Sequence, residues 1–124
     1  MTASTMARVS GIDATYYTVR DLARGTAFYM ALIGMEPTTA MPGFVSEWTF
    51  ASGESFGLYQ LSGEDGGFKP SGMVMFAVPD VAAAAAACKA SGVTMHRDVM
   101  ETPSCQMAFG EDPDGNQFVL HHRT

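Results

Sequence analysis

The sequence has 124 residues, 47% of them hydrophobic and 16% charged, with a formal net charge of −6. This length and composition predict one globular domain with its own core. The acidic balance argues against nucleic acid and anionic membrane surfaces as partners, because both need clustered Lys and Arg. No apolar run is long enough to span a membrane, and residues 1–10 lack the apolar segment of an export signal, so we expect a cytoplasmic protein.

After a loose N-terminal arm over residues 1–10, the first half of the chain predicts a strand, a helix and three strands. Residues 11–19 are rich in the β-branched and aromatic side chains that strands favour. Asp21 stands at the N-cap of a helix whose apolar residues recur at helical spacing, and Gly34 ends this helix. The further strands are expected at 36–41, 44–51 and 55–61, with a hairpin turn at 52–54.

A glycine-rich linker over 62–71 precedes a second half with the same order. A strand at 73–78 is followed by the cap Asp80, an alanine-rich helix and Gly92, which ends it. Strands are then predicted at 93–100, at 105–110 and after the turn Asp112-Pro113-Asp114-Gly115-Asn116.

The two halves form an internal repeat. Asp21 corresponds to Asp80, 59 positions later, and the turn residue Gly53 corresponds to Gly115, 62 positions later. This predicts two βαβββ modules, 11–61 and 72–124, within one domain over 11–124. With an offset of 59, Glu47 and Gln106 are expected to occupy matching places, as are Trp48 and Met107.

Two such modules, the opening stretch VRDLARGTAFYMALIGME and the closing stretch EDPDGNQFVLHHR resemble the vicinal oxygen chelate superfamily. That group includes glyoxalase I, extradiol dioxygenases and bleomycin-resistance proteins, and the resemblance runs from about residue 11 to 123. It implies an α+β fold in which two βαβββ modules form a cup-shaped mixed sheet, with a small-molecule ligand in the cup. It also implies a homodimer.

The family's enzymes usually hold a divalent metal through His, Glu or Gln on the first and last strands of each module. The resemblance carries these ligand positions to Ala14, Gly57, Met73 and Val119. Three of the four have no donor atom, and a thioether prefers soft metals. We therefore predict no cofactor, with a divalent metal as the alternative.

Side chains alternate along a strand, so the residues that share a face with these four positions should line the cup. This inventory is apolar and aromatic with a few polar groups, as in a small-molecule pocket. The alternative is that the same residues fill a closed core. The predicted ligand-binding residues are Tyr16, Glu47, Trp48, Gly57, Tyr59, Met73, Met75, Gln106, Val119 and His121.

Three functions remain open at this point. The first is a metal-free protein that binds a small apolar or aromatic molecule. The second is a metal-free enzyme that uses His121 or Tyr59 as acid or base, since a histidine titrates near neutral pH. The third is a metal-dependent lyase, isomerase or dioxygenase with ligands at other positions. We favour the first.

Overall fold

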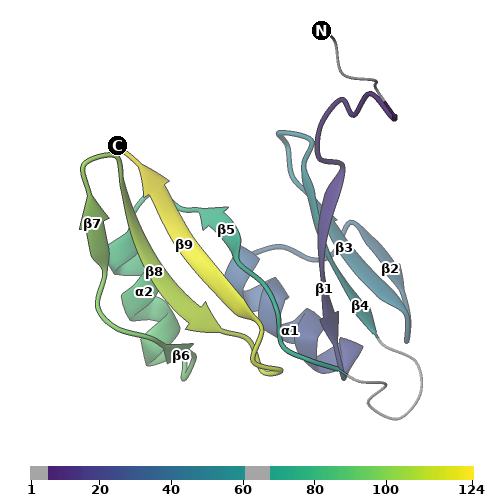
Figure 1. The fold of residues 1–124 in the computed structure, drawn as a ribbon. Coiled ribbons are helices and arrows are strands. Elements are labelled where there is room, and N and C mark those ends of the chain that lie inside the picture. Colours follow the sequence, from purple (N-terminus) through teal and green to yellow (C-terminus); the bar gives the residue numbers. More distant parts are fainter. Residues whose placement is uncertain (1–5, 61–67) are drawn as a thin grey trace, which may run out of the picture.

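The structure is a computed structural model that describes residues 6–60 and 68–124 (Figure 1). Each half begins with a strand and a helix and continues with further strands. The first module consists of β1 (Ala14–Val19), α1 (Leu22–Ile33), β2 (Thr39–Met41), β3 (Val45–Thr49) and β4 (Ser55–Gln60). The second consists of β5 (Val74–Ala77), α2 (Val81–Ala90), β6 (Thr94–Met95), β7 (Met100–Thr102), β8 (Cys105–Glu111) and β9 (Gln117–Arg123).

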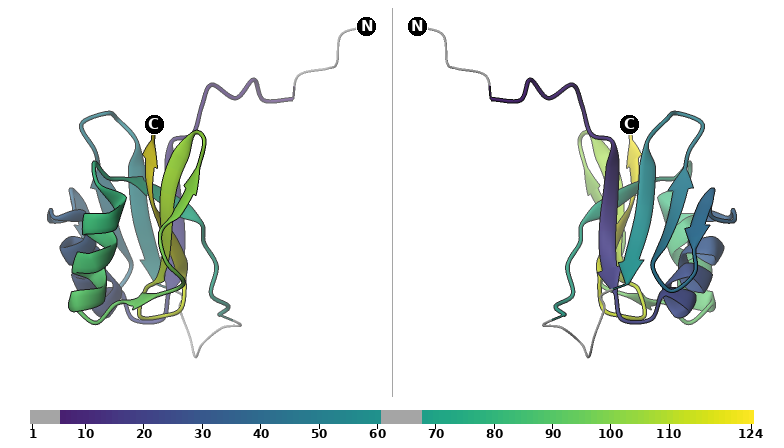
Figure 2. Two further views of the ribbon diagram at one scale, coloured as in Figure 1. Left: turned by 90° about the vertical axis from the view of Figure 1, so that its left-hand side faces the viewer. Right: turned by 90° about the vertical axis from the view of Figure 1, so that its right-hand side faces the viewer.

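The strands form two mixed sheets. The four-stranded sheet has the order β1-β4-β3-β2, and the five-stranded sheet has the order β5-β9-β8-β6, with β7 paired to β8. In each sheet the first and last strands of the module are parallel neighbours, β1 with β4 and β5 with β9. The two sheets stand side by side with both helices behind them (Figures 1 and 2). This confirms the predicted α+β fold of two βαβββ modules.

The helix boundaries follow the predicted caps. The Asp21 carboxylate accepts a hydrogen bond from the Arg24 amide at 3.1 Å, and the Asp80 carboxylate accepts one from the Ala83 amide at 3.0 Å. Gly34 has φ 86°, a left-handed conformation that glycine adopts without strain. Within the described residues neither helix is long and apolar enough to cross a membrane. The predicted linker at 62–71 lies mostly outside those residues, as do residues 1–5 of the predicted arm.

The prediction of one strand over 93–100 is wrong. The chain forms β6 over only two residues, bends at Arg97, whose φ is 48°, and resumes as β7. The Thr102 hydroxyl oxygen accepts the Cys105 amide at 3.1 Å and so closes the turn between β7 and β8. The left-handed backbone at Arg97 interrupts the extended run, a local conformation that β propensity does not predict.

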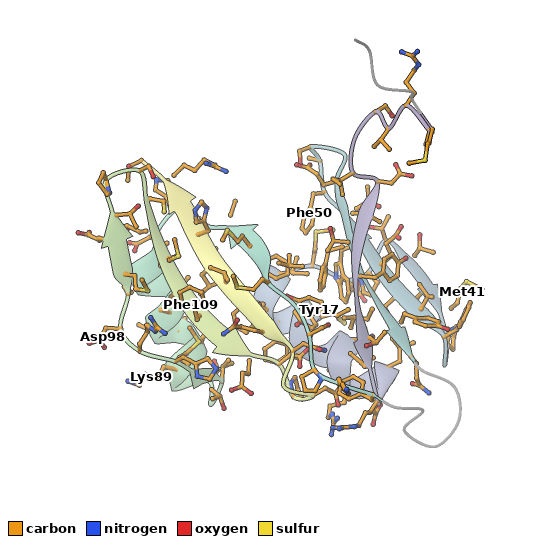
Figure 3. The ribbon with its side chains drawn as sticks, in the orientation of Figure 1. Tyr17, Met41, Phe50, Lys89, Asp98 and Phe109 are labelled. Carbon is orange, nitrogen blue, oxygen red and sulfur yellow. The ribbon has the colours of Figure 1, made fainter. Side chains whose placement is uncertain are left out.

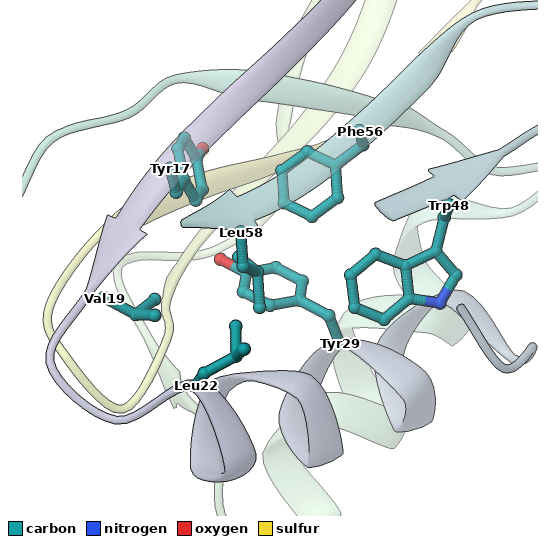
Figure 4. Close-up of a cluster of buried hydrophobic side chains, with 7 residues drawn as sticks. All are labelled: Tyr17, Val19, Leu22, Tyr29, Trp48, Phe56 and Leu58. Carbon is teal, nitrogen blue, oxygen red and sulfur yellow. The ribbon is translucent and has the colours of Figure 1, made fainter. Parts of the chain in front are cut away.

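The core lies between the sheets and the helices. Tyr17, Trp48 and Phe56 of the first sheet pack around Tyr29 of α1, which is completely buried (Figure 4). Phe28 of α1 and Phe76 of β5 contact both this cluster and the buried cluster of the second module. Because α1 and β5 belong to both clusters, the modules share one core.

A buried polar network at the turn 112–116 ties the modules together. Asp112 is 5% exposed, and its carboxylate accepts hydrogen bonds from the backbone amides of Asp114 and Asn116, both at 2.9 Å. It also accepts the Tyr29 hydroxyl at 2.9 Å and the Asn116 side-chain amide at 3.0 Å. Burial and the neighbouring Asp112 carboxylate raise the pKa of Tyr29 above its ordinary value. Since Tyr29 belongs to the first module, Asp112 links one module to the other.

Asn116 extends this network in two directions. Its side-chain amide donates to the Thr18 carbonyl of β1 at 2.9 Å, and its side-chain oxygen accepts the Ser71 amide at 2.8 Å, just before β5. Tyr17 adds a further link, because its hydroxyl donates to the Gln117 carbonyl and accepts the Val74 amide. The end of β1 is thereby fixed beside the start of β5.

Candidate functional site

Two adjoining clefts lie along the boundary between β1 and β5. The first, which we call the apolar cleft, has a volume of about 460 Å³. The second, the tyrosine cleft, has a volume of about 490 Å³ and is lined by residues 15–17 and 71–75. Thr15, Val74 and Met75 line both clefts, so the two adjoin at the boundary between the sheets, and we call them together the groove.

The apolar cleft draws its surface from both modules and from the end of α1. Figure 3 shows Phe50 and Tyr17 beside the gap between the sheets. The polar side chains in the lining are Thr15, Ser52, Glu54 and Ser55. The apolar side chains are Leu32, Ile33, Phe50, Phe56, Val74, Met75, Phe76, Ala77, Val78 and Leu120.

Three of the predicted ligand-binding residues form one row across the first sheet. Tyr16 on β1 lies opposite Gly57 on β4, and Gly57 lies opposite Glu47 on β3. The Tyr16 hydroxyl donates a hydrogen bond to the Glu47 carboxylate. A Cβ atom at position 57 would lie 2.6 Å from the Tyr16 ring, so the ring crosses the sheet through the space that glycine leaves open.

This contact changes the acidity of the phenol. The hydrogen bond to Glu47, together with partial desolvation and the nearby negative charge, raises the pKa of Tyr16 to about 12. The sign follows from the donor role: the neutral phenol is stabilised by donating to a carboxylate, whereas a phenolate would be repelled. Near neutral pH the pair is therefore a neutral phenol beside Glu47.

The corresponding row of the second sheet is apolar. Met75 on β5 lies opposite Val119 on β9, which lies opposite Phe109 on β8. Met75 is 48% exposed and Met73, just before β5, is 52% exposed, whereas Val119 is fully buried. The predicted residues Met73 and Met75 thus line the tyrosine cleft together with Tyr16.

The two predicted acid–base residues are not brought together. Tyr59 lies on β4 of the first sheet, where its ring contacts Phe44 with centroids 5.7 Å apart. His121 lies on β9 of the second sheet, between Ala77 and Met107. No hydrogen bond or ring contact in the described part of the chain joins them.

Trp48 and Gln106 lie on the helix-facing sides of their sheets. Trp48 is completely buried, and its indole N–H donates to the Met35 carbonyl at 2.9 Å. Gln106 lies opposite His122 and donates to the Glu101 carboxylate at 2.7 Å. Neither side chain lines the groove.

The predicted match of Glu47 with Gln106 is wrong. Glu47 lies opposite Gly57 and Phe109 lies opposite Val119, so the true counterpart of Glu47 is Phe109, 62 positions later. By the same register Trp48 corresponds to Gly110 rather than Met107. The predicted match is off by three residues, and an odd shift reverses the face to which a strand residue points.

The alternation of side chains within strands does not predict the apolar cleft. The groove also uses Leu32 and Ile33, the last residues of α1, and Phe50 after β3. The apolar pair Leu32 and Ile33, next to Gly34 at the end of the helix, is the signal that the sequence offers.

The residues at the family's metal-ligand positions do not fit a divalent metal. Ala14, Gly57 and Val119 offer no donor atom, and Met73 offers only a thioether. The Tyr16 ring also covers the space beside Gly57. Among the residues that the structure describes, no three His, Cys, Asp or Glu side chains lie close enough to hold a metal ion.

Comparison with known proteins assigns the family. The model of the Glyoxalase/Bleomycin resistance protein/Dioxygenase superfamily matches residues 11–120. The chain therefore belongs to this superfamily, as the sequence motifs predicted. A search of curated proteins gave no match.

Solved structures share the fold. A glyoxalase/dioxygenase from Nostoc punctiforme is 13% identical with a TM-score of 0.77, covering 100% of this chain and 99% of that one. A lactoylglutathione lyase from Agrobacterium tumefaciens is 18% identical with a TM-score of 0.75, covering 94% and 96%. A glyoxalase/bleomycin resistance protein from Catenulispora acidiphila is 18% identical with a TM-score of 0.71, covering 90% and 98%. At these identities the likeness shows the fold alone.

We predict that Tyr16 titrates near pH 12 and that Glu47→Gln lowers its pKa toward the ordinary value of 10. The substitution keeps a hydrogen-bond acceptor but removes the charge that opposes phenolate formation. Any stability that the contact adds is complete below pH 10 and is lost as the pH rises through 12. NMR titration of ring-labelled tyrosine measures this pKa. An unchanged pKa in the variant would show that the two side chains do not interact in solution.

Proposed function

We propose that this protein binds a small, largely apolar or aromatic molecule in the groove between β1 and β5, without the metal site of the family's enzymes. The observation that carries the proposal is the pair of adjoining clefts, lined from both modules and sharing Thr15, Val74 and Met75. Their volumes of about 460 and 490 Å³ lie within the range of about 300–1,000 Å³ that is common for ligand sites.

The lining of the groove favours an apolar ligand. Phe50, Phe76 and Leu120 line the apolar cleft, and transferring apolar ligand surface from water onto such side chains is favourable. Met73 and Met75 add flexible thioether side chains that adapt to ligands of different shape. The groove therefore suits a molecule with a substantial hydrocarbon or aromatic part.

Binding is favoured over catalysis by the placement of the ionisable groups. Tyr59 and His121 lie on different sheets without a shared contact, and neither lines the groove. The family's metal-ligand positions hold no suitable donors. A lyase, isomerase or dioxygenase activity of this chain would need other residues than these. A cytoplasmic location stays a prediction from the sequence.

We predict that 1-naphthylmethanol, as a probe with an aromatic body, binds the protein equally well with and without EDTA. Thr15→Trp should raise its dissociation constant about tenfold or more, because an indole in both clefts displaces the probe. Thr94→Trp is the matched control, since Thr94 is an exposed residue of β6, at the far edge of the second sheet and outside both clefts. Isothermal titration calorimetry measures all three constants.

Two outcomes of this experiment would contradict the proposal. Binding that EDTA abolishes would show that a metal is required. Equal binding by Thr15→Trp and Thr94→Trp would place the probe outside the groove. Thermal unfolding of both variants establishes that they are folded under the titration conditions.

We also propose that the chain forms a homodimer through a patch at one end of the first sheet, formed by Met41, Phe44 and Tyr59. Met41 is 50% exposed, Phe44 is 48% exposed, and Phe44 contacts Tyr59, which is 36% exposed. Contiguous exposed apolar side chains of this size are typical of protein interfaces. This proposal is independent of what the groove binds.

Light scattering should give twice the chain mass of 13.2 kDa, and Phe44→Lys should reduce the mass to that of one chain. A buried lysine without a partner is costly at an apolar interface. Val9→Lys is the control, because Val9 is also exposed but lies on the N-terminal segment before β1. A wild-type mass of 13.2 kDa, or a Phe44→Lys dimer, would contradict this assembly.

A further inference from the structure

We infer that the ligand of the groove carries a protonated amine on its apolar body, and that the Tyr16–Glu47 pair binds this amine. This inference rests on the proposed function and adds the chemical class of the ligand. It is carried by one contact, the hydrogen bond from the Tyr16 hydroxyl to Glu47 across Gly57.

Within residues 6–60 and 68–124, Glu47 is a carboxylate without a cationic partner. The Tyr16 phenol donates to Oε1, and no Lys, Arg or His side chain of the described residues forms an ion pair with Glu47. The residue is only half-buried, so a ligand can reach it. Because a carboxylate has about four lone-pair sites, Oε2 remains available to accept N–H groups. The hydrogen bond from Tyr16 thus fixes the position of the Glu47 carboxylate. No cation of the described residues neutralises its negative charge.

The pair adjoins the tyrosine cleft. Tyr16 lines that cleft with Met73 and Met75, and its ring runs from the cleft over Gly57 to Glu47. A ligand whose apolar part lies against the two methionines can therefore place an amine at Glu47 along the tyrosine ring. A cation beside the face of an aromatic ring gains a further attraction.

The described part of the groove offers no positively charged side chain that could bind an anionic group of a ligand. Among the described residues that line the two clefts there is no Lys, Arg or His, and Glu54 is the charged residue of this described lining. In the second sheet the row that corresponds to Tyr16, Gly57 and Glu47 is Met75, Val119 and Phe109. The groove therefore combines an apolar surface with acidic groups, which matches an amphiphilic amine and disfavours a carboxylate or phosphate.

The test compares three probes that share one ring system: 1-naphthylmethylammonium, 1-naphthylmethanol and 1-naphthoate. Calorimetric titration of the wild-type protein should show the ammonium binding about three- to tenfold more tightly than the alcohol, and the carboxylate most weakly. Glu47→Gln should remove the preference for the ammonium while leaving the affinity for the alcohol within about twofold. Glutamine can still accept the Tyr16 hydrogen bond, so the variant changes the charge and keeps the geometry.

Glu36→Gln is the matched control, because Glu36 is exposed, lines neither cleft, and its substitution changes the net charge equally. This variant should keep the preference for the ammonium. Equal affinities of the wild type for ammonium and alcohol would overturn the inference and leave the proposed function standing. The same holds if Glu47→Gln retains the full preference, or if Glu36→Gln loses it. Failure of all three probes to bind the folded protein would overturn the inference and the proposed function together.

Discussion

The buried network of Asp112, Asn116 and Tyr29 is the constraint on which the arrangement of the two modules depends. A buried carboxylate is costly unless it is hydrogen-bonded, and Asp112 accepts four hydrogen bonds, one of them from Tyr29 of the other module. Asn116 then fixes the end of β1 and the segment before β5 through the carbonyl of Thr18 and the amide of Ser71. The relative position of the two sheets follows from these contacts and from the shared aromatic core.

The apolar cleft lies away from this network. The network holds β1 near its end, at Thr18, whereas the apolar cleft is lined by Thr15 near the start of the strand and by Ser55 at the start of β4. The sheets are therefore fastened at one end of β1, and the apolar cleft lies toward the other end. The first sheet contributes the Tyr16–Glu47 pair to this region and the second contributes methionines. The two modules have the same fold but different side chains. Because of this difference, the Tyr16–Glu47 pair lies on the side of the first module and the methionines lie on the side of the second.

The parts of this arrangement that depend on local sequence are predictable. Asp21, Gly34 and Asp80 mark the helix ends because capping and left-handed glycine are local effects. Strand alternation likewise places Tyr16 and Gly57 on one face, because the period of a strand is fixed. The closing turn 112–116 is also recognisable, although its glycine and proline suggest only a tight turn. Its role as the joint is not visible in the sequence, because Tyr29 and Thr18 are distant along the chain.

The predictions that are wrong or missing are those that depend on strand register or on packing between elements. An offset of 59 holds from strand to helix cap, but the second module has three more residues before its last hairpin, where β6 and β7 replace one strand. That difference moves Gln106 to the helix-facing side and makes Phe109 the counterpart of Glu47. The apolar cleft is not predicted for another reason, because residues at the end of α1 and residues of a strand in the other module line it together. No pattern within a single element records such a contact.

The most direct test of this arrangement is the free energy of unfolding of Asn116→Ala, measured by urea denaturation. Removing the side chain leaves the Thr18 carbonyl and the Ser71 amide without their partner and takes one donor from Asp112. We predict a loss of about 2–4 kcal/mol, while Asp98→Ala, at an exposed position, should change the value by less than about 0.5 kcal/mol. A loss in Asn116→Ala no larger than in Asp98→Ala would contradict the role of this turn as the joint between the modules.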